Sequence, residues 1–201
     1  MTVRRRRAAR LAALLALAAV LAPAGPAAGR ASATATSRLY LDGDSLALGT
    51  GLFLPRYLPG WRIEQQVDVS RHAYQGAAAI EARRRSLPRV VVVNLGTNDD
   101  PRGVHEFASD VRRVVRAAGP GRCVVWATIV RPPYAGVSYE GLNRVLFAAA
   151  RRWPGFHVFD WRGLARAHPG WFGADGVHPS IAGYRLRARA LARFVRAACA
   201  S

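Results

Sequence analysis

Three short polar clusters, each following an apolar run, contain the residue types needed for nucleophilic catalysis by serine. They are Asp42-Gly43-Asp44-Ser45, Gly96-Thr97-Asn98-Asp99 and Asp175-Gly176-Val177-His178. A serine hydroxyl is a poor nucleophile until a base takes its proton, and His178 can be that base for Ser45. Asp175 can accept a hydrogen bond from the imidazole Nδ1, fix its tautomer and stabilise the imidazolium. The Asn98 side chain can donate an N–H to a developing oxyanion, so the clusters together predict acyl transfer through a serine.

The segments between these clusters predict the scaffold that would bring them together. Short apolar runs predict strands over 39–41, 61–69, 90–95, 123–130 and 156–159. Several of these runs are β-branched and continuous, as is typical of strands buried on both faces. Helical patterns predict helices over 74–84, 104–118, 139–152 and 181–198. This alternation is typical of an α/β fold with an open parallel sheet in a single domain. Because the working groups of such sheets gather where the strands end, we expect the three clusters to meet at one edge.

The same motifs resemble those of the SGNH (GDSL) hydrolase family, and the likeness spans nearly all of residues 39–198. The matching residues are Gly43-Asp44-Ser45-Leu46, Gly96-Thr97-Asn98-Asp99 and Asp175-x-x-His178. The resemblance implies a three-layer, flavodoxin-like α/β fold with about five parallel strands. It also makes Ser45 the nucleophile and His178 the base, with Asp175 as its partner. The oxyanion hole would consist of the Ser45 N–H, a glycine N–H and the Asn98 side chain.

The turn after the second expected strand departs from the family pattern. The family usually has a glycine there, whereas this chain has Val69-Ser70-Arg71-His72-Ala73, and its nearest glycine is Gly76. A main-chain N–H does not require glycine, so the departure is compatible with activity. We therefore assign the second backbone donor of the oxyanion hole to Ser70.

The C-terminal part of the sequence is similar to one branch of the family. Its features are Phe159-Asp160-Trp161, His168-Pro169-x-Trp171-Phe172, the loop around His178 and Gly183. They resemble SGNH domains at the extracellular end of peptidoglycan O-acetyltransferases. Those proteins usually carry a membrane-embedded acyltransferase part, which we do not expect here. The resemblance therefore implies a free-standing secreted esterase or transferase.

The first 33 residues have the composition of a secretory signal peptide. Arginines at 4–7 and 10 precede an apolar run over 11–22, and small residues lead to Ala31-Ser32-Ala33, an A-x-A cleavage pattern. As a helix, this run would span about 18 Å against a hydrocarbon core of about 30 Å, so we expect no stable membrane span. We predict a signal peptide at 1–33, a hydrolase domain at 34–201, and a protein that is secreted or associated with the cell wall.

The charge of the chain comes from arginine alone. All 30 basic residues are arginines, and with 12 acidic residues they give a net charge of +18. Six arginines lie in the predicted signal peptide, leaving 24 basic and 12 acidic residues, or +12, on the mature chain. Arginine without lysine, beside abundant alanine, glycine and valine, indicates a compositional bias, so no nucleic-acid partner is expected. A solvated surface is the simpler interpretation, and electrostatic association with an anionic cell wall is the alternative.

These features together predict a secreted esterase that hydrolyses carboxylic esters through an acyl-enzyme on Ser45. Its substrate would be a small-molecule or glycan ester carrying a short acyl or O-acetyl group. One alternative is an O-acetyltransferase, which would pass the acyl group to a hydroxyl of a cell-wall glycan. The other is a basic wall-binding module without activity. No cofactor or metal is expected, because His72, His105, His157 and His168 lack close ligand spacing.

The two cysteines are candidates for a disulfide, because export leads to an oxidising compartment. The helix over 181–198 begins at the carboxyl end of the sheet, so it must run back toward the amino ends of the strands. Its 18 residues would span about 27 Å, and the segment 123–130 about 26 Å, so the lengths match. Cys123 and Cys199 should therefore lie at the same, non-catalytic end, where their lateral offset decides whether they can bond.

Overall fold

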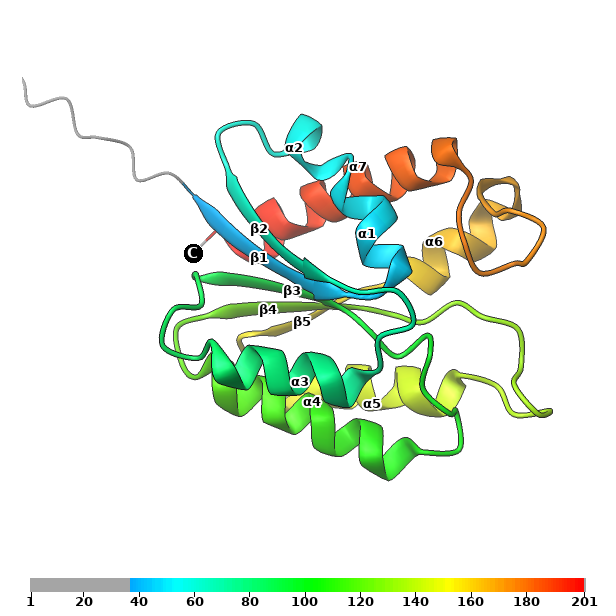
Figure 1. Cartoon of the computed structure of the whole chain (residues 1–201), viewed down its shortest axis with the longest axis horizontal. Helices are drawn as coiled ribbons and strands as arrows, with labels where there is room; N and C mark the ends of the chain where they lie inside the picture. The colour runs from blue at the N-terminus through cyan, green and yellow to red at the C-terminus, as the bar shows by residue number, and fades with distance from the viewer. Residues whose placement is uncertain (1–36, 201) are drawn as a thin grey trace, which may run out of the picture. The chain divides into compact units, whose positions relative to one another are not determined.

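The computed structural model describes residues 37–200, which are built around one parallel β-sheet. The predicted signal peptide at 1–33 lies outside the described residues. The strands are β1 (Arg38–Gly43), β2 (Arg62–Val67), β3 (Val90–Asn94), β4 (Cys123–Ala127) and β5 (Phe156–Phe159). Their order is β2-β1-β3-β4-β5, and every neighbouring pair is parallel. The structure confirms the predicted α/β class and its parallel sheet (Figure 1).

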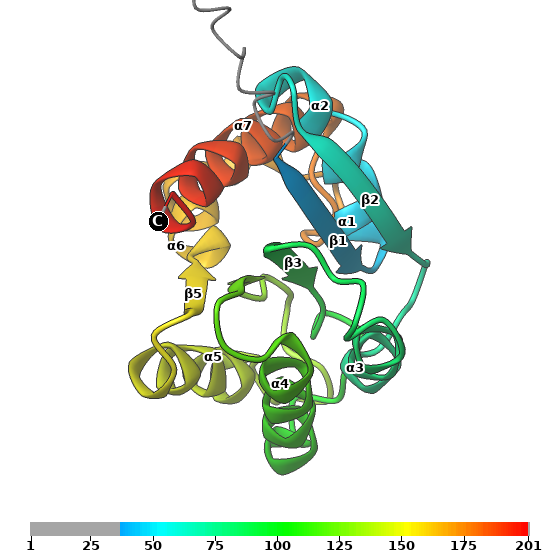
Figure 2. The same cartoon turned by 90° about the vertical axis from the view of Figure 1, so that its left-hand side faces the viewer.

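Helices cover both faces of the sheet, as Figure 1 and the turned view in Figure 2 show. One face carries α3 (Ala73–Ala82), α4 (Val104–Ala118) and α5 (Glu140–Arg152). The other carries α1 (Ser45–Gly51), α2 (Leu54–Tyr57), α6 (Trp161–Ala167), the short 3₁₀ helix η1 (Pro169–Trp171) and α7 (Ile181–Ala198). These three layers and this strand order are those of the flavodoxin-like fold. Within residues 37–200, no helix has the length and apolar character that a membrane crossing requires.

Alternating strand residues supply a hydrophobic core on each face of the sheet. On β3, Val91 and Val93 pack toward α3, α4 and α5, while Val90 and Val92 pack toward α6 and α7. The central strands β1, β3 and β4 are buried on both faces, which explains their apolar sequences. Because a slip of one residue would exchange the two faces, these cores fix the register and therefore the positions where the strands end.

The connections of the sheet change sides between β1 and β3. Helices α1 and α2 connect β1 to β2 on one face, whereas α3 connects β2 to β3 on the opposite face and carries the chain past β1. In open α/β sheets, ligands bind outside the carboxyl ends of the strands at such a switch point. Two of the predicted polar clusters follow β1 and β3, so the topology places them there.

The structure corrects the predicted elements in three places. The strand expected over 61–69 is shorter, at Arg62–Val67, and its residues are half-buried or exposed because β2 lies at the edge of the sheet. The expected strand over 123–130 was too long, since pairing ends at Ala127. Helices α2 and α6 were not predicted, because four and seven residues are too few to show a helical period.

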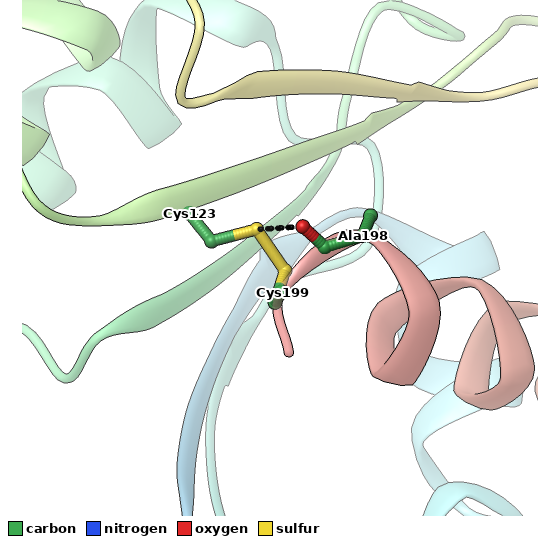
Figure 3. Close-up of a disulfide and its surroundings, with 3 residues drawn as sticks. All are labelled: Cys123, Ala198 and Cys199. Carbon is green, nitrogen blue, oxygen red and sulfur yellow. Dashed lines mark hydrogen bonds between the residues drawn. A yellow bond between two sulfur atoms is a disulfide. The ribbon is translucent and has the colours of Figure 1, made fainter. Parts of the chain in front are cut away.

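Cys123 and Cys199 form a disulfide (Figure 3). It lies at the end of the sheet where the strands begin, opposite the polar clusters. Cys123 begins β4, and Cys199 follows the last residue of α7, so the helix returns the chain to the start of that strand. The two Cα atoms lie 5.6 Å apart, and both residues are buried in the core on the α7 face. The bridge ties the last helix to the sheet.

Removing this disulfide should destabilise the domain. The double variant Cys123→Ala/Cys199→Ala frees two positions that are 76 residues apart in the sequence. In the chain-entropy model, a loop of this length contributes about 4 kcal/mol to the free energy of unfolding. Denaturant unfolding of the variant and the wild type, both without reductant, measures the loss. If both thiols of the denatured, unreduced wild-type protein react with a maleimide, the bridge is absent in solution.

Candidate active site

Ser45 is the first residue of α1 and follows the carboxyl end of β1 almost directly. The turn between them is tight at Gly43, where a Cβ atom would lie 2.7 Å from the backbone carbonyl oxygen of Asn94. Glycine therefore permits the close approach of β1 and β3 at this point. Asp44 caps α1, because its side chain accepts a hydrogen bond of 2.9 Å from the Leu46 N–H. These contacts fix the backbone that carries Ser45.

Ser45, His178 and Asp175 form a continuous hydrogen-bonded row. Ser45 Oγ lies 2.9 Å from His178 Nε2, and His178 Nδ1 lies 2.6 Å from Asp175 Oδ2. The other carboxylate oxygen of Asp175 accepts hydrogen bonds from the backbone N–H groups of Val177 and His178. The hydrogen bond from the His178 side chain, together with these amides, holds the pKa of Asp175 well below its usual range. Asp175 is therefore ionised and keeps the proton of a neutral His178 on Nδ1, which leaves Nε2 free to accept from Ser45.

The loop that carries Asp175 and His178 lies between η1 and α7. The Gly173 N–H closes it by donating to the His178 carbonyl oxygen at 2.8 Å. Gly176 has a φ of +65°, a conformation that glycine adopts without strain, and it allows the chain to reverse between the two side chains. The side chains of His178 and Asp175 are 46% and 51% exposed, so solvent and solutes can reach the row.

Asn98 follows β3 and connects the turns after three strands. Its Nδ2 donates to the backbone carbonyl oxygen of Arg71 at 3.2 Å, in the turn after β2. The same nitrogen lies 3.4 Å from Asp44 Oδ2, a longer and weaker hydrogen bond to the turn after β1. The position of this amide is therefore set from both neighbouring turns.

Ser70 lies in the turn after β2 with a φ of +60°, in the left-handed region that favours glycine. The serine thus adopts the conformation for which a glycine would be the usual choice. Ser70 does not line the cleft that contains Ser45 and Asn98, but the next residue, Arg71, accepts the hydrogen bond from Asn98. Within residues 37–200, neither the Ser45 nor the Ser70 backbone N–H is hydrogen-bonded to an acceptor.

Contacts of Arg71 with Asp42 and Gln66 hold the turn after β2 in place. Arg71 Nη1 donates to the Gln66 carbonyl oxygen at 2.9 Å and lies 3.6 Å from Asp42 Oδ1. Asp42 is fully buried, and burial raises its pKa to about 6 despite the Arg71 charge and a hydrogen bond from Tyr40. On the other side of the turn, Asp99 accepts hydrogen bonds from the Ala73 N–H and so ties the end of β3 to the start of α3.

The predicted residues Ser45, Asn98, Asp175 and His178 border a single cleft of about 400 Å³. Its remaining walls come from Thr97, from Val177 between Asp175 and His178, and from the segment after β4, which contributes Arg131, Pro132, Pro133 and Tyr134. The sequence motifs did not identify this segment, and its only signal was its place after another strand end. A larger hollow of about 610 Å³ beside α4 and α5 is lined by aliphatic, arginine and tryptophan side chains and contains no nucleophile.

The three-layer fold, with a serine, a histidine and an aspartate in a row at the carboxyl edge of the sheet, defines an α/β protein of the SGNH type. Residues 42–186 match the model of the GDSL-like Lipase/Acylhydrolase family, and the chain belongs to this family. The resemblance to SGNH (GDSL) hydrolases predicted from the motifs is thereby confirmed. Members of such a family are enzymes that act on esters.

Relatives of two kinds are similar to this chain. The O-acetyltransferase OatA of Staphylococcus aureus is 26% identical over 147 residues, which cover 71% of this chain but 22% of that protein. The C-terminal catalytic domain of peptidoglycan O-acetyltransferase A from Streptococcus pneumoniae superposes with a TM-score of 0.67 at 24% identity, covering 81% of this chain and 94% of the domain. The psychrotrophic esterase EstA from Pseudoalteromonas sp. superposes with a TM-score of 0.56 at 15% identity, covering 79% and 94% of the two chains.

Proposed function

We propose that this protein cleaves carboxylic esters through an acyl-enzyme on Ser45. The observation that carries the proposal is the hydrogen-bonded row from Ser45 Oγ through His178 to Asp175, with distances of 2.9 and 2.6 Å. This row supplies a nucleophile, a base and an anion that stabilises the protonated base. The row is open to a cleft, so an ester can reach the serine.

In the first half of the reaction, Ser45 Oγ attacks the carbonyl carbon of the ester, and its proton passes to His178 Nε2. The ionised Asp175 stabilises the resulting imidazolium without taking its proton. The tetrahedral intermediate then collapses: the bond to the alcohol oxygen breaks, and His178 returns the proton to that oxygen. The alcohol leaves, and the acyl group stays on Ser45 as an ester.

Stabilisation of the intermediate is assigned to the Ser45 N–H, the Ser70 N–H and Asn98 Nδ2. Two observations support this set. The two backbone N–H groups have no acceptor within residues 37–200, and Asn98 Nδ2 makes two hydrogen bonds, of 3.2 Å to the Arg71 carbonyl oxygen and of 3.4 Å to Asp44 Oδ2. A negatively charged oxygen accepts stronger hydrogen bonds than a neutral one, so it can compete for these donors as charge develops.

The second half of the reaction decides between hydrolase and transferase. If water attacks the acyl-enzyme, the product is a short carboxylic acid and the protein is an esterase. If a glycan hydroxyl attacks, the acetyl group moves to a sugar. The likeness to O-acetyltransferases supports transfer, and the family description together with the open, half-exposed row supports hydrolysis. We favour the esterase and keep the O-acetyltransferase as the second candidate.

We also propose that the protein is exported and associates with the cell wall. The composition of residues 1–33 and the net charge of +12 on the remaining chain support a secreted protein that associates with an anionic wall. A small-molecule or glycan ester would be the substrate there. A binding module without activity would have no need of the Ser45–His178 contact, so we rank it last.

The purified protein distinguishes these alternatives in one series of assays. We expect the protein to cleave p-nitrophenyl acetate, and we expect the rate to fall as the acyl chain of the p-nitrophenyl ester lengthens. We also expect it to remove acetyl groups from acetylated xylan or acetylated peptidoglycan. Adding chito-oligosaccharides and measuring acetylated sugar by mass spectrometry detects transfer. An esterase releases acetate in equal amount to p-nitrophenol, whereas a transferase yields acetylated acceptor. Failure to turn over any ester contradicts both enzymes and leaves the wall-binding module.

A further inference from the structure

Arg187 on α7 is a buried charge, with 1% of its surface exposed. Its Nη1 donates to the Leu46 carbonyl oxygen at 3.3 Å and to Thr50 Oγ1, and its Nη2 donates to Asn94 Oδ1. The guanidinium lies over the ring of Trp161, with Cζ 4.9 Å from the ring centroid. Arg187 therefore joins α7 both to α1 and to the carboxyl end of β3.

Packing alone does not account for this residue. Burial lowers the pKa of Arg187 to about 10, and the charge of Asp44 opposes that shift, so the guanidinium keeps its proton at neutral pH. Within residues 37–200, Arg187 forms no direct ion pair, and its Nε is buried without a partner. A buried charge without a direct ion pair is costly, and even buried ion pairs can often be replaced by apolar residues of similar volume without loss of stability. The buried charge points to a role in the arrangement of its polar neighbours.

Those neighbours lead to the residues assigned to catalysis. Because Arg187 donates to Asn94 Oδ1, the Asn94 Nδ2 faces the other way and donates to Asp44 Oδ1 at 3.0 Å. The same oxygen caps the first turn of α1, which begins with Ser45. The second oxygen of Asp44 accepts the hydrogen bond from Asn98 Nδ2. Burial raises the pKa of Asp44, and the Arg187 charge opposes this rise and favours the ionised form that accepts these bonds.

We propose that Arg187 is a positioning residue that acts through Asn94 and Asp44 to hold Ser45 and the Asn98 amide in place for acyl transfer. Arg187 does not touch the ester. It orients the Asn94 amide, and that amide and the guanidinium charge together keep the Asp44 carboxylate where it can cap α1 and hold Asn98. This inference rests on the proposed function, since it concerns the roles of Ser45 and Asn98 in that reaction.

Arg187→Met tests the inference, because methionine fills much of the space without charge or donors. We expect kcat for p-nitrophenyl acetate to fall by about 10²-fold with little change in KM, since misplaced reacting groups are felt in the transition state. The matched control is Arg189→Met on the exposed side of α7, which should retain wild-type kinetics. Circular dichroism and thermal unfolding report the folded fraction, to which both rates are normalised. A kcat equal to that of Arg189→Met overturns the proposal.

Arg187→Lys keeps the test valid if the methionine variant does not fold. Lysine retains the charge, but its single nitrogen cannot bridge acceptors on both α1 and β3 as the planar guanidinium does. We expect kcat to lie between the wild-type and methionine values, about 10-fold below wild type. A folded lysine variant with wild-type kcat overturns the proposal.

A second measurement separates failure of this inference from failure of the proposed function. The side-chain amide signals of Asn98 in ¹⁵N–¹H spectra report its hydrogen bonding without any turnover. They should shift in a folded Arg187 variant, methionine or lysine, and stay unchanged in Arg189→Met. If the wild type cleaves no ester, the proposed function fails, and the Asn98 signals still decide whether Arg187 positions this amide. Unchanged Asn98 signals in the folded Arg187 variant overturn the inference.

Discussion

Ser45→Ala lowers kcat for p-nitrophenyl acetate by about 10⁴-fold or more and leaves the domain folded. The loss is large because Ser45 Oγ is the nucleophile in contact with His178 Nε2, and without it no acyl-enzyme can form. The fold is expected to survive because the α1 cap uses the Asp44 side chain rather than the serine hydroxyl. Steady-state kinetics on the purified variant measure the first effect, and thermal unfolding measures the second.

Ser86→Ala is the matched control for this substitution. Ser86 is exposed in the turn after α3, and its hydroxyl donates only to the Arg83 carbonyl oxygen, at 3.2 Å. Its removal should leave kcat and KM at their wild-type values. If Ser45→Ala keeps a tenth of the wild-type activity, some other group performs the attack, and the serine mechanism is wrong.

The central residues of the site were predictable because local sequence and topology agree on them. Ser45 and Asn98 lie in the turns that follow strands buried on both faces, and parallel strands bring such positions to one edge. Asp175 and His178 are close in the chain, so their contact needs only a short loop. The long helices α4 and α7 were predicted at their observed bounds, because their apolar stripes extend over several turns.

The turn at Ser70 was predictable in position but not in conformation. A serine with positive φ contradicts its local preference, and the surrounding contacts of Arg71 with Gln66 and Asp42 must hold it there. Those contacts join β1 to the turn after β2, and they depend on the strand order. No pattern in a single sequence contains that order.

The buried hydrogen-bond network that positions the active site was not predicted, for the same reason. Arg187 lies four residues after Gly183 and four before Leu191, on the buried stripe of α7, and an arginine at such a position was a signal for a buried polar contact. Its partners Asn94 and Thr50 come from β3 and α1, so only the packed structure shows which acceptors it meets. The cleft walls formed by the segment after β4 were missed as well, because their position depends on how a loop without a recognisable motif folds over the edge of the sheet.

Asp175→Asn should reduce kcat/KM by about 10⁴-fold, close to the effect of removing the serine. In this structure the Oδ1 atom of Asp175 accepts two backbone N–H groups, so the carbonyl oxygen of the asparagine would stay on them. The amide nitrogen then faces His178 Nδ1 and donates to it. The imidazole proton moves to Nε2, where it points at Ser45 and blocks the acceptance of the hydroxyl proton.

The tautomer itself can be observed, which separates this cause from simple misfolding. The ¹⁵N shifts of the His178 ring should report a protonated Nδ1 in the neutral wild type and a protonated Nε2 in Asp175→Asn. Asp100→Asn is the matched control, because this carboxylate is exposed, pairs with Arg102 and does not line the cleft. It should keep both the wild-type tautomer and the wild-type kcat/KM. An Asp175→Asn variant with the Nε2 tautomer and undiminished turnover would show that His178 does not act as the base, since an Nε2 that already carries a proton cannot accept one from Ser45.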